Sequence, residues 1–142
     1  MSDESSDDAD EIPDELREKI DADPFCDRLG IELVDLGAGT ATLELTLAED
    51  MCNFHGTPHG GVIYSLADAA FAASSNSHGT TAVALETNMS YLMAAEVGQT
   101  LRAEAEETHM AGRTAEYQID ITTVDDGERV ATFRGRVYRF VD

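Results

Sequence analysis

Asp68 is the single charged residue of a long, alanine-rich segment, G-G-V-I-Y-S-L-A-D-A-A-F-A-A-S-S-N-S, from Gly60 to Ser77. Burial raises the pKa of a carboxyl group because desolvation disfavours the charged form. In a cleft, such a group is a candidate general base or nucleophile. The spacing alone also fits a narrow polar stripe of Ser65, Asp68 and Ser75 on a solvent-facing side of a helix.

A glycine-containing loop, N-F-H-G-T-P-H-G-G, leads into this segment from Asn53 to Gly61. The first backbone N–H groups of a helix have no partner within it, so they can bind a phosphate or a developing oxyanion. Gly60 and Gly61 would place such groups at the helix start. An ordinary glycine-rich loop that enters a helix has the same pattern, so the glycines alone leave both interpretations open.

Metal and serine chemistry are less well supported. Cys52, His55 and His59 are all capable of binding zinc, but no fourth ligand is evident in the sequence. Imidazoles in a glycine-rich loop more often form hydrogen bonds, so we expect no metal. The chain has no Gly-x-Ser-x-Gly sequence that would indicate a nucleophilic serine.

One long helix and a set of strands must position these residues. The segment from Gly60 to about Ser77 is free of proline and rich in alanine, which predicts the long helix. A short helix is expected from Pro13 to Ile20, where acidic residues follow the proline and basic residues come near the end. We predict that residues 1–10 are an acidic disordered tail and that residues 11–142 form a single domain.

The remaining sequence alternates between apolar and polar residues, as half-buried strands do. A first hairpin is expected from residues 31–36 and 41–47 across Gly37-Ala38-Gly39. Four more strands are expected at residues 83–91, 101–105, 115–121 and 128–140. These elements predict an α+β domain in which an antiparallel sheet wraps around one long central helix.

The composition is strongly acidic, with 29 Asp and Glu against 9 Lys and Arg and a net charge of −20. Nucleic acids and anionic membranes are therefore not expected as partners, because both would be repelled. We interpret the charge as adaptation to a cytoplasm of very high salt, where the Debye length falls to roughly 3 Å at about 1 M. An acidic protein of an ordinary cytoplasm is the alternative.

The two cysteines, Cys26 and Cys52, form no Cys-x-x-Cys pair. The first residues, M-S-D-E-S-S-D-D-A-D, lack the features of a signal peptide, and no apolar run is long enough to span a membrane. We therefore expect a reduced, soluble, cytoplasmic protein.

Taken together, these residues resemble the hot-dog fold acyl-CoA thioesterases, specifically the group of PaaI-type phenylacetyl-CoA thioesterases. The resemblance covers about residues 26–140. It rests on N-x-x-x-x-x-H-G-G, which begins at Asn53, and on S-L-A-D-x-A-F-A around Asp68. N-S-H-G after the helix and F-R-G-R-V-Y-R-F near the end of the chain add to it.

The resemblance implies a hydrolase of aryl- or short- to medium-chain acyl-CoA, without a cofactor, since coenzyme A is part of the substrate. Asp68 would activate water or attack the thioester carbonyl directly. The backbone N–H of Gly60 would polarise the thioester oxygen, with Gly61 also in the binding site. Asn53 and His59 would orient the substrate, the water and the loop.

Other positions bear on the water and on coenzyme A. Some relatives carry a serine on the strand after the helix to hold the water, whereas this chain has Ala84, and Ser90 is no evident replacement. Coenzyme A is polyanionic, so Arg113, Arg134 and Arg136 are candidate contacts. Only Arg113 resembles a recurrent phosphate contact of the family, and each arginine could instead pair with a carboxylate.

Helix geometry predicts a shared active site. Eight residues separate Gly60 from Asp68, which is about 12 Å along one helix, so one thioester carbonyl cannot readily touch both. Two antiparallel copies of the helix would bring Gly60 of one chain near Asp68 of the other. We therefore expect a homodimer that shares its active sites, with a dimer of dimers as the larger assembly.

Two other functions fit the same fold. A non-catalytic acyl-CoA-binding module would bind the ligand without turnover, and the intact Asp68 argues against it. A hot-dog enoyl-CoA hydratase would carry an Asp and His pair spaced for acid and base work. His59 precedes Asp68 by nine residues, which matches the thioesterase arrangement better.

Overall fold

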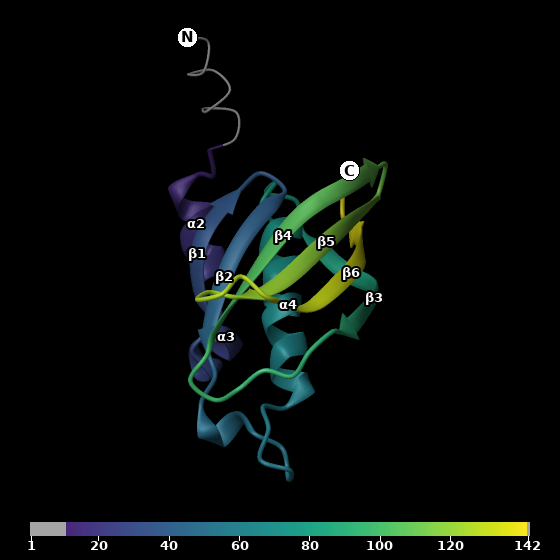
Figure 1. The fold of residues 1–142 in the computed structure, drawn as a ribbon. Helices are drawn as coiled ribbons and strands as arrows, with labels where there is room; N and C mark the ends of the chain where they lie inside the picture. The colour runs from purple at the N-terminus through teal and green to yellow at the C-terminus, as the bar shows by residue number, and fades with distance from the viewer. Residues whose placement is uncertain (1–10, 142) are drawn as a thin grey trace.

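The structure is a computed structural model that describes residues 11–141, so the predicted acidic tail of residues 1–10 lies outside the described residues. Figure 1 shows the order of the elements. They are α2 (Asp14–Asp21), α3 (Pro24–Leu29), β1 (Glu32–Gly37), β2 (Thr40–Thr46), the 3-10 turn η1 (Glu49–Met51), α4 (Gly60–Ser75), β3 (Ala82–Tyr91), β4 (Thr100–Ala111), β5 (Thr114–Thr123) and β6 (Arg129–Arg139). No helix in this part of the chain has the length and apolar character needed to cross a membrane.

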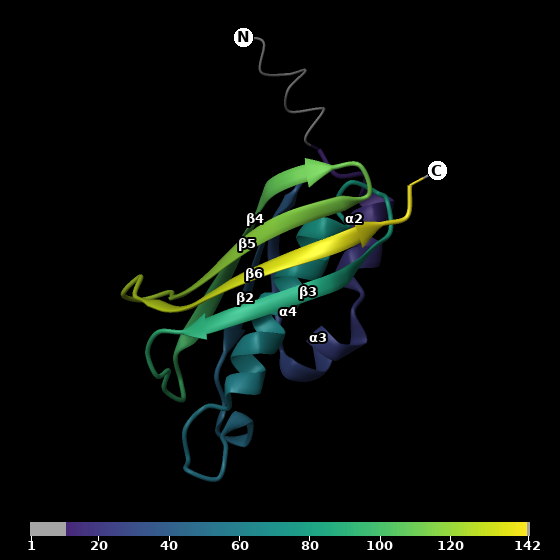
Figure 2. The same ribbon diagram turned by 90° about the vertical axis from the view of Figure 1, so that its right-hand side faces the viewer.

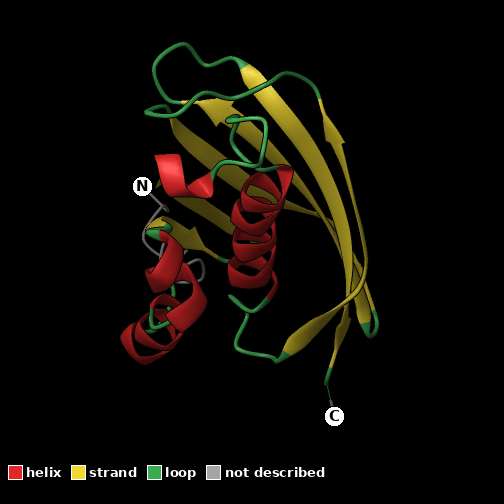
Figure 3. Cartoon of the chain, turned by 90° about the horizontal axis from the view of Figure 1, so that it is seen from below, coloured by secondary structure: helices red, strands yellow, loops and turns green. Residues whose placement is uncertain are grey.

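The six strands form one antiparallel sheet in the order β1-β2-β4-β5-β6-β3. The sheet curves around α4, which Figures 2 and 3 show from two directions. The α+β prediction, with an antiparallel sheet wrapped around one long helix, is therefore confirmed. The predicted first hairpin and the four later strands are all present, and their bounds agree within two residues except in β4, which continues to Ala111 where the sequence pattern ends at residue 105.

The core lies between α4 and the concave face of the sheet. Phe71 of α4 packs against Tyr117 and Phe133, with ring centroids 6.0 and 5.6 Å apart. A Cβ atom at Gly135 would lie 2.6 Å from the ring of Phe71, so only glycine fits at this point of β6. Strand β5 alternates between buried and half-buried residues along its whole length, as the sequence pattern predicts.

Helix α4 ends at Ser75, two residues earlier than the sequence suggests. Asn76 causes the early end. Its side-chain amide donates hydrogen bonds to the carbonyl oxygens of Ala72 and Ala82, at 2.9 and 3.2 Å, and its side-chain oxygen accepts one from the N–H of Ala82 at 2.9 Å. The chain therefore turns directly into β3.

Helix α3 was not predicted from the sequence. Asp23 caps it by accepting a hydrogen bond from the N–H of Cys26 at 3.0 Å, Pro24 is its first residue, and Gly30 ends it with a φ of 82°. Together α2 and α3 lie beside α4 on a side that the sheet leaves open (Figure 3).

Strand β3 lies at one end of the sheet, and within residues 11–141 it pairs only with β6. Several of its apolar side chains are about half exposed: Val83 is 47%, Leu85 51% and Tyr91 51% exposed. The unpaired N–H and C=O groups of a long, apolar edge strand can bind a strand of another chain, so this edge is suited to association with a second protein chain.

Candidate active site

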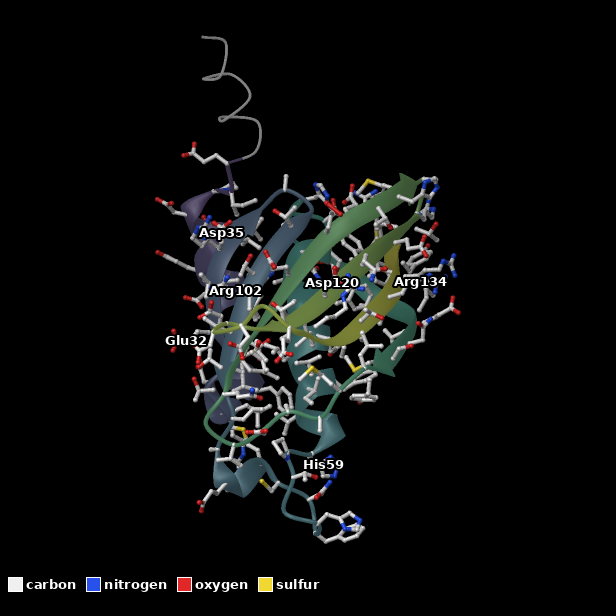
Figure 4. All side chains as sticks on the ribbon, in the orientation of Figure 1. Glu32, Asp35, His59, Arg102, Asp120 and Arg134 are labelled. Atoms are coloured by element: carbon white, nitrogen blue, oxygen red, sulfur yellow. The ribbon has the colours of Figure 1, made fainter. Side chains whose placement is uncertain are left out.

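His59 caps the N-terminus of α4. Its Nδ1 atom accepts a hydrogen bond from the backbone N–H of Gly61 at 2.9 Å. An accepting Nδ1 carries no proton, so the neutral ring holds its proton on Nε2 and offers a donor there. The backbone N–H of His59 donates to the carbonyl oxygen of Met51 at 2.8 Å, which fixes the loop against η1. Figure 4 shows His59 at this end of the molecule.

The backbone N–H of Gly60 finds no acceptor among residues 11–141. Its carbonyl oxygen, by contrast, accepts a hydrogen bond from the hydroxyl of Tyr91 at 3.0 Å. A cavity of about 350 Å³ adjoins this point and is lined by Gly60, Ile63, Tyr91, Leu92 and Met93, among others. A free N–H at a helix start can stabilise a negatively charged oxygen.

Asn53 organises the loop before α4. Its side-chain oxygen accepts hydrogen bonds from the N–H of His55 at 2.9 Å and from the N–H and hydroxyl of Thr57, both at 3.2 Å. Its own N–H donates to the carbonyl oxygen of Thr57 at 2.8 Å. The oxygen of Asn53 is therefore used within the loop, and its NH₂ group is the part left for a substrate.

Asp68 lies two turns further along α4, on the same face as Gly61, Ser65 and Ala72. Its side chain reaches solvent in the single chain, but the surrounding protein still removes part of its hydration. This burial raises the pKa of Asp68 above its ordinary value, and the negative charge of Asp23 raises it further. A carboxylate with a raised pKa is a stronger base once ionised.

A larger cavity, of about 380 Å³ and open on one side, lies between the two short helices and the second half of α4. Its apolar walls include Leu16, Ile20, Ala69, Ala72 and Ala73. Apolar walls of this kind suit the hydrocarbon part of a ligand.

Asp68 itself does not line this cavity, but Asp23 and Cys26 do, and both lie close enough to Asp68 to interact with it electrostatically. Burial, chiefly, together with the charges of Asp23, Asp27 and Asp68, raises the pKa of Cys26 to about 12. The thiol of Cys26 is therefore unreactive at neutral pH.

In the single chain, the structure brings Asn53, His59, Gly60 and Gly61 together at one end of α4. Asp68 stands apart from them, since eight residues of helix correspond to about 12 Å. The predicted oxyanion site and the predicted carboxylate therefore do not meet within one copy of the chain.

The predicted arginines lie elsewhere. Arg134 and Arg136 point away from α4 on the outer face of β6, where they form ion pairs with Glu116 and Glu86. Figure 4 labels Arg134 on this face. The Nη1 atom of Arg113 donates to the carbonyl oxygen of Val141 at 2.8 Å. The structure therefore contains the alternative arrangement for Arg134 and Arg136, in which each pairs with a carboxylate. Contacts of the three arginines with coenzyme A stay predictions.

Ala84 lies exposed on β3 and offers no hydrogen-bonding side chain, so the water-holding role of a serine there has no counterpart. Cys52, His55 and His59 do not converge. Within residues 11–141, no three His, Cys, Asp or Glu side chains come close enough to hold a metal ion.

Two residues near the site were missed by the sequence interpretation. Asp23 affects Asp68, and its D-P-F context, a capping residue followed by proline, could have revealed helix α3. Tyr91 contacts Gly60 from 31 positions away, and no local pattern signals that contact.

Comparisons with known proteins give a consistent result. The family model described as the Thioesterase superfamily matches residues 55–130. The acyl-coenzyme A thioesterase PaaI of Escherichia coli K12 is 38% identical over 111 residues, which are 78% of this chain and 79% of that protein.

Solved structures are similar over most of the chain. The structure of the E. coli PaaI protein from the phenylacetic acid degradation operon has a TM-score of 0.83 and 34% identity, and the match covers 88% of this chain and 90% of that one. The TT0310 protein of Thermus thermophilus has a TM-score of 0.79 and 40% identity, with 83% of this chain and 98% of that one covered.

Proposed function

The chain belongs to the thioesterase superfamily and has the hot-dog fold, and on this basis we propose that it hydrolyses acyl-CoA thioesters with aryl or short- to medium-chain acyl groups. The E. coli relative is named an acyl-coenzyme A thioesterase. The observation that carries the proposal is Asp68, a carboxylate with a raised pKa that stands next to Ala69 on α4, and Ala69 lines a cavity with apolar walls. These are the properties of a base or nucleophile beside a binding site for a hydrocarbon group.

In the net reaction, the acyl carbon loses its C–S bond and gains the oxygen of one water molecule, and the released thiolate of coenzyme A takes up a proton from that water. Asp68 either removes a proton from this water or attacks the carbonyl itself, forming an anhydride that water then cleaves. Both routes require the ionised carboxylate. The free N–H of Gly60 would stabilise the oxygen anion that develops on the carbonyl.

Asn53, His59 and Gly61 support the start of the helix in this proposal. His59 holds the N–H of Gly61 through its Nδ1 atom and presents its Nε2 proton as a further donor. Asn53 keeps the loop closed through Thr57 and has its NH₂ group available.

We propose that a second copy of the chain completes the site, because Gly60 and Asp68 are too far apart in one copy. The edge of β3 is the natural place for this contact, since its apolar side chains are half exposed and its outer edge is unpaired in the single chain. Antiparallel pairing of two β3 strands would set the two α4 helices side by side about a two-fold axis.

Charge also favours this surface. Two copies with a net charge of −20 repel each other unless they meet through uncharged residues. Between Asp50 and Glu86, Asp68 is the single acidic or basic residue apart from three histidines. This stretch contains the loop, all of α4 and the first half of β3. The part of the chain with the least charge therefore coincides with the proposed interface.

The direct test is the substitution Asp68→Asn, which keeps the shape of the side chain and removes the carboxylate. We expect turnover of acyl-CoA substrates to fall at least about a hundredfold while the protein stays folded. Asp120→Asn, which removes a partly exposed carboxylate near Arg129 on the outer face of the sheet, is the matched control and should change turnover little. Turnover of the Asp68→Asn protein within a few-fold of wild type would overturn the assignment.

A further inference from the structure

Phe54 has the highest solvent exposure of the large apolar side chains in the described part of the chain, at 93%. Its ring packs against that of the neighbouring His55 in a tilted arrangement, with centroids 4.2 Å apart and an angle of 44° between the ring planes. The loop beneath it is held closed by the hydrogen bonds between Asn53 and Thr57. The ring is therefore presented to solvent on a fixed support.

A second exposed ring stands beside the larger cavity. Phe25 of α3 is 56% exposed, and its two neighbours in the chain, Pro24 and Cys26, both line that cavity. The cavity is open on one side, and its lining combines the exposed residues Ala22 and Pro24 with the charged residues Lys19, Asp21 and Asp23. An apolar cover would bury the apolar part of this opening.

The proposed dimer brings the loop and the cavity together. With Gly60 of one copy opposite Asp68 of the other, the loop projects beyond the N-terminal end of α4 (Figures 1 and 2). In an antiparallel pair of α4 helices, the loop of one copy therefore extends alongside the other copy's helix, past Asp68 and toward its C-terminal end. The part of the helix that follows Asp68 carries Ala69, Ala72 and Ala73, which line the cavity.

We propose that Phe54 of one copy covers the larger cavity of the other copy and forms the outer wall of the acyl pocket at the shared active site. This inference rests on the proposed function. A second copy is the occupant that the charge pattern favours, because Phe54 lies in the nearly uncharged stretch between Asp50 and Glu86. The acyl group then lies between the alanine face of α4 and the ring of Phe54, beside the carboxylate of Asp68.

The ring should therefore select the acyl group. A phenylacetyl or hexanoyl group reaches the outer wall, whereas an acetyl group does not fill the cavity. We expect Phe54→Ala to lower kcat/KM for phenylacetyl-CoA and hexanoyl-CoA at least about tenfold relative to acetyl-CoA. Phe54→Leu should recover part of the loss. Val124→Ala, which truncates an exposed apolar side chain beyond the end of β5, is the control and should leave the ratio unchanged.

Mixed dimers test whether the ring acts across the interface. A dimer of one Asp68→Asn chain and one Gly60→Pro chain has one competent site, built from Gly60 of the first chain and Asp68 of the second. Phe54→Ala should change the acyl preference when it is placed in the Asp68→Asn chain. The same change in the Gly60→Pro chain should leave the preference as it was.

A cross-link tests the contact without relying on activity. In a background with Cys26→Ala and Cys52→Ser, the pair Phe54→Cys and Ala72→Cys should form a disulfide between two chains on mild oxidation. The pair Phe54→Cys and Val124→Cys should form none. The cross-linked product is measured as a dimer band in a non-reducing gel.

The outcomes separate the two proposals. If the wild-type protein cleaves no acyl-CoA, the proposed function fails, while the cross-link still decides the contact. If the mixed dimer is active but Phe54→Ala has the same effect in either chain, or none, the inference about Phe54 is overturned and the hydrolase assignment stands. Absence of the cross-link in a folded dimer overturns the inference as well.

Discussion

The hydroxyl of Tyr91 donates a hydrogen bond to the carbonyl oxygen of Gly60 over 3.0 Å. The same peptide unit carries the N–H of Gly61, which donates to Nδ1 of His59 at 2.9 Å. Three groups from β3, the helix start and the loop are thus joined through one peptide. Hydrogen bonds in such a chain polarise one another, so Tyr91 helps to hold the imidazole of His59 in place.

Tyr91→Phe should therefore lower kcat by about two- to tenfold with little change in KM, because one neutral hydrogen bond contributes about 0.5–1.5 kcal/mol. Thermal unfolding should change only slightly. Steady-state kinetics with a thiol-reactive dye would measure the effect. Tyr138→Phe on β6 is the matched control. An unchanged kcat in the Tyr91→Phe protein would show that this hydroxyl does not position the site.

The pH dependence should reflect Asp68. Since its pKa is raised, chiefly by burial and then by the charge of Asp23, activity should fall as the pH drops through this raised pKa. Asp23→Asn removes the negative charge and should shift the acidic limb of the pH–kcat/KM profile to lower pH. Asparagine caps a helix as well as aspartate does, so α3 should remain intact. An acidic limb that stays in place, or moves to higher pH, would contradict this explanation.

The substitution Asp68→Asn, which lowers activity, should increase the stability of the fold. A carboxyl whose pKa is higher in the folded than in the unfolded chain stabilises the fold at low pH, and this stabilisation is lost as the pH rises through the folded pKa. Asp68→Asn should therefore raise Tm at pH 7 to 8. The gain should shrink below the ordinary pKa of about 3.8. Thermal unfolding of both proteins at pH 8 and at a pH below about 3.8 measures the change in Tm. A lower Tm for the Asp68→Asn protein at pH 8 would refute the prediction.

Salt should matter to the fold as a whole. With a net charge of −20, the surface carboxylates repel one another, and screening weakens this repulsion. We expect the circular dichroism signal and Tm to fall when KCl is reduced from about 2 M to about 0.1 M. Identical unfolding curves at both concentrations would rule out adaptation to high salt but would leave the hydrolase assignment untouched.

Strands β2, β4, β5 and β6 could be predicted because their burial largely alternates in the way that the sequence does, and α4 because its segment is rich in alanine and free of proline. Residues 114–123 of β5 are the clearest case, with every second side chain buried. The end of α4 could not be predicted, since it depends on two hydrogen bonds between Asn76 and Ala82, one in each direction, and Ala82 belongs to another element. Helix α3 is too short to show a helical period.

The candidate site likewise contains residues that the sequence indicates and contacts that only the folded structure reveals. Asp68, Gly60 and His59 stand out by residue type and spacing, so the sequence indicates them. The influence of Asp23 on Asp68 and the contact of Tyr91 with Gly60 arise from tertiary packing. These contacts join segments that are far apart in the chain, and only the folded structure reveals them.

If two copies associate through the open edge of β3, the activity of the protein depends on its concentration. If each active site needs two copies, a dilute solution contains incomplete sites, and specific activity falls with dilution below the dissociation constant of the dimer. The melting temperature would then rise with protein concentration, because association draws the equilibrium toward the folded dimer. A cell could thus set the activity of this hydrolase through its abundance alone, without an effector or a covalent modification.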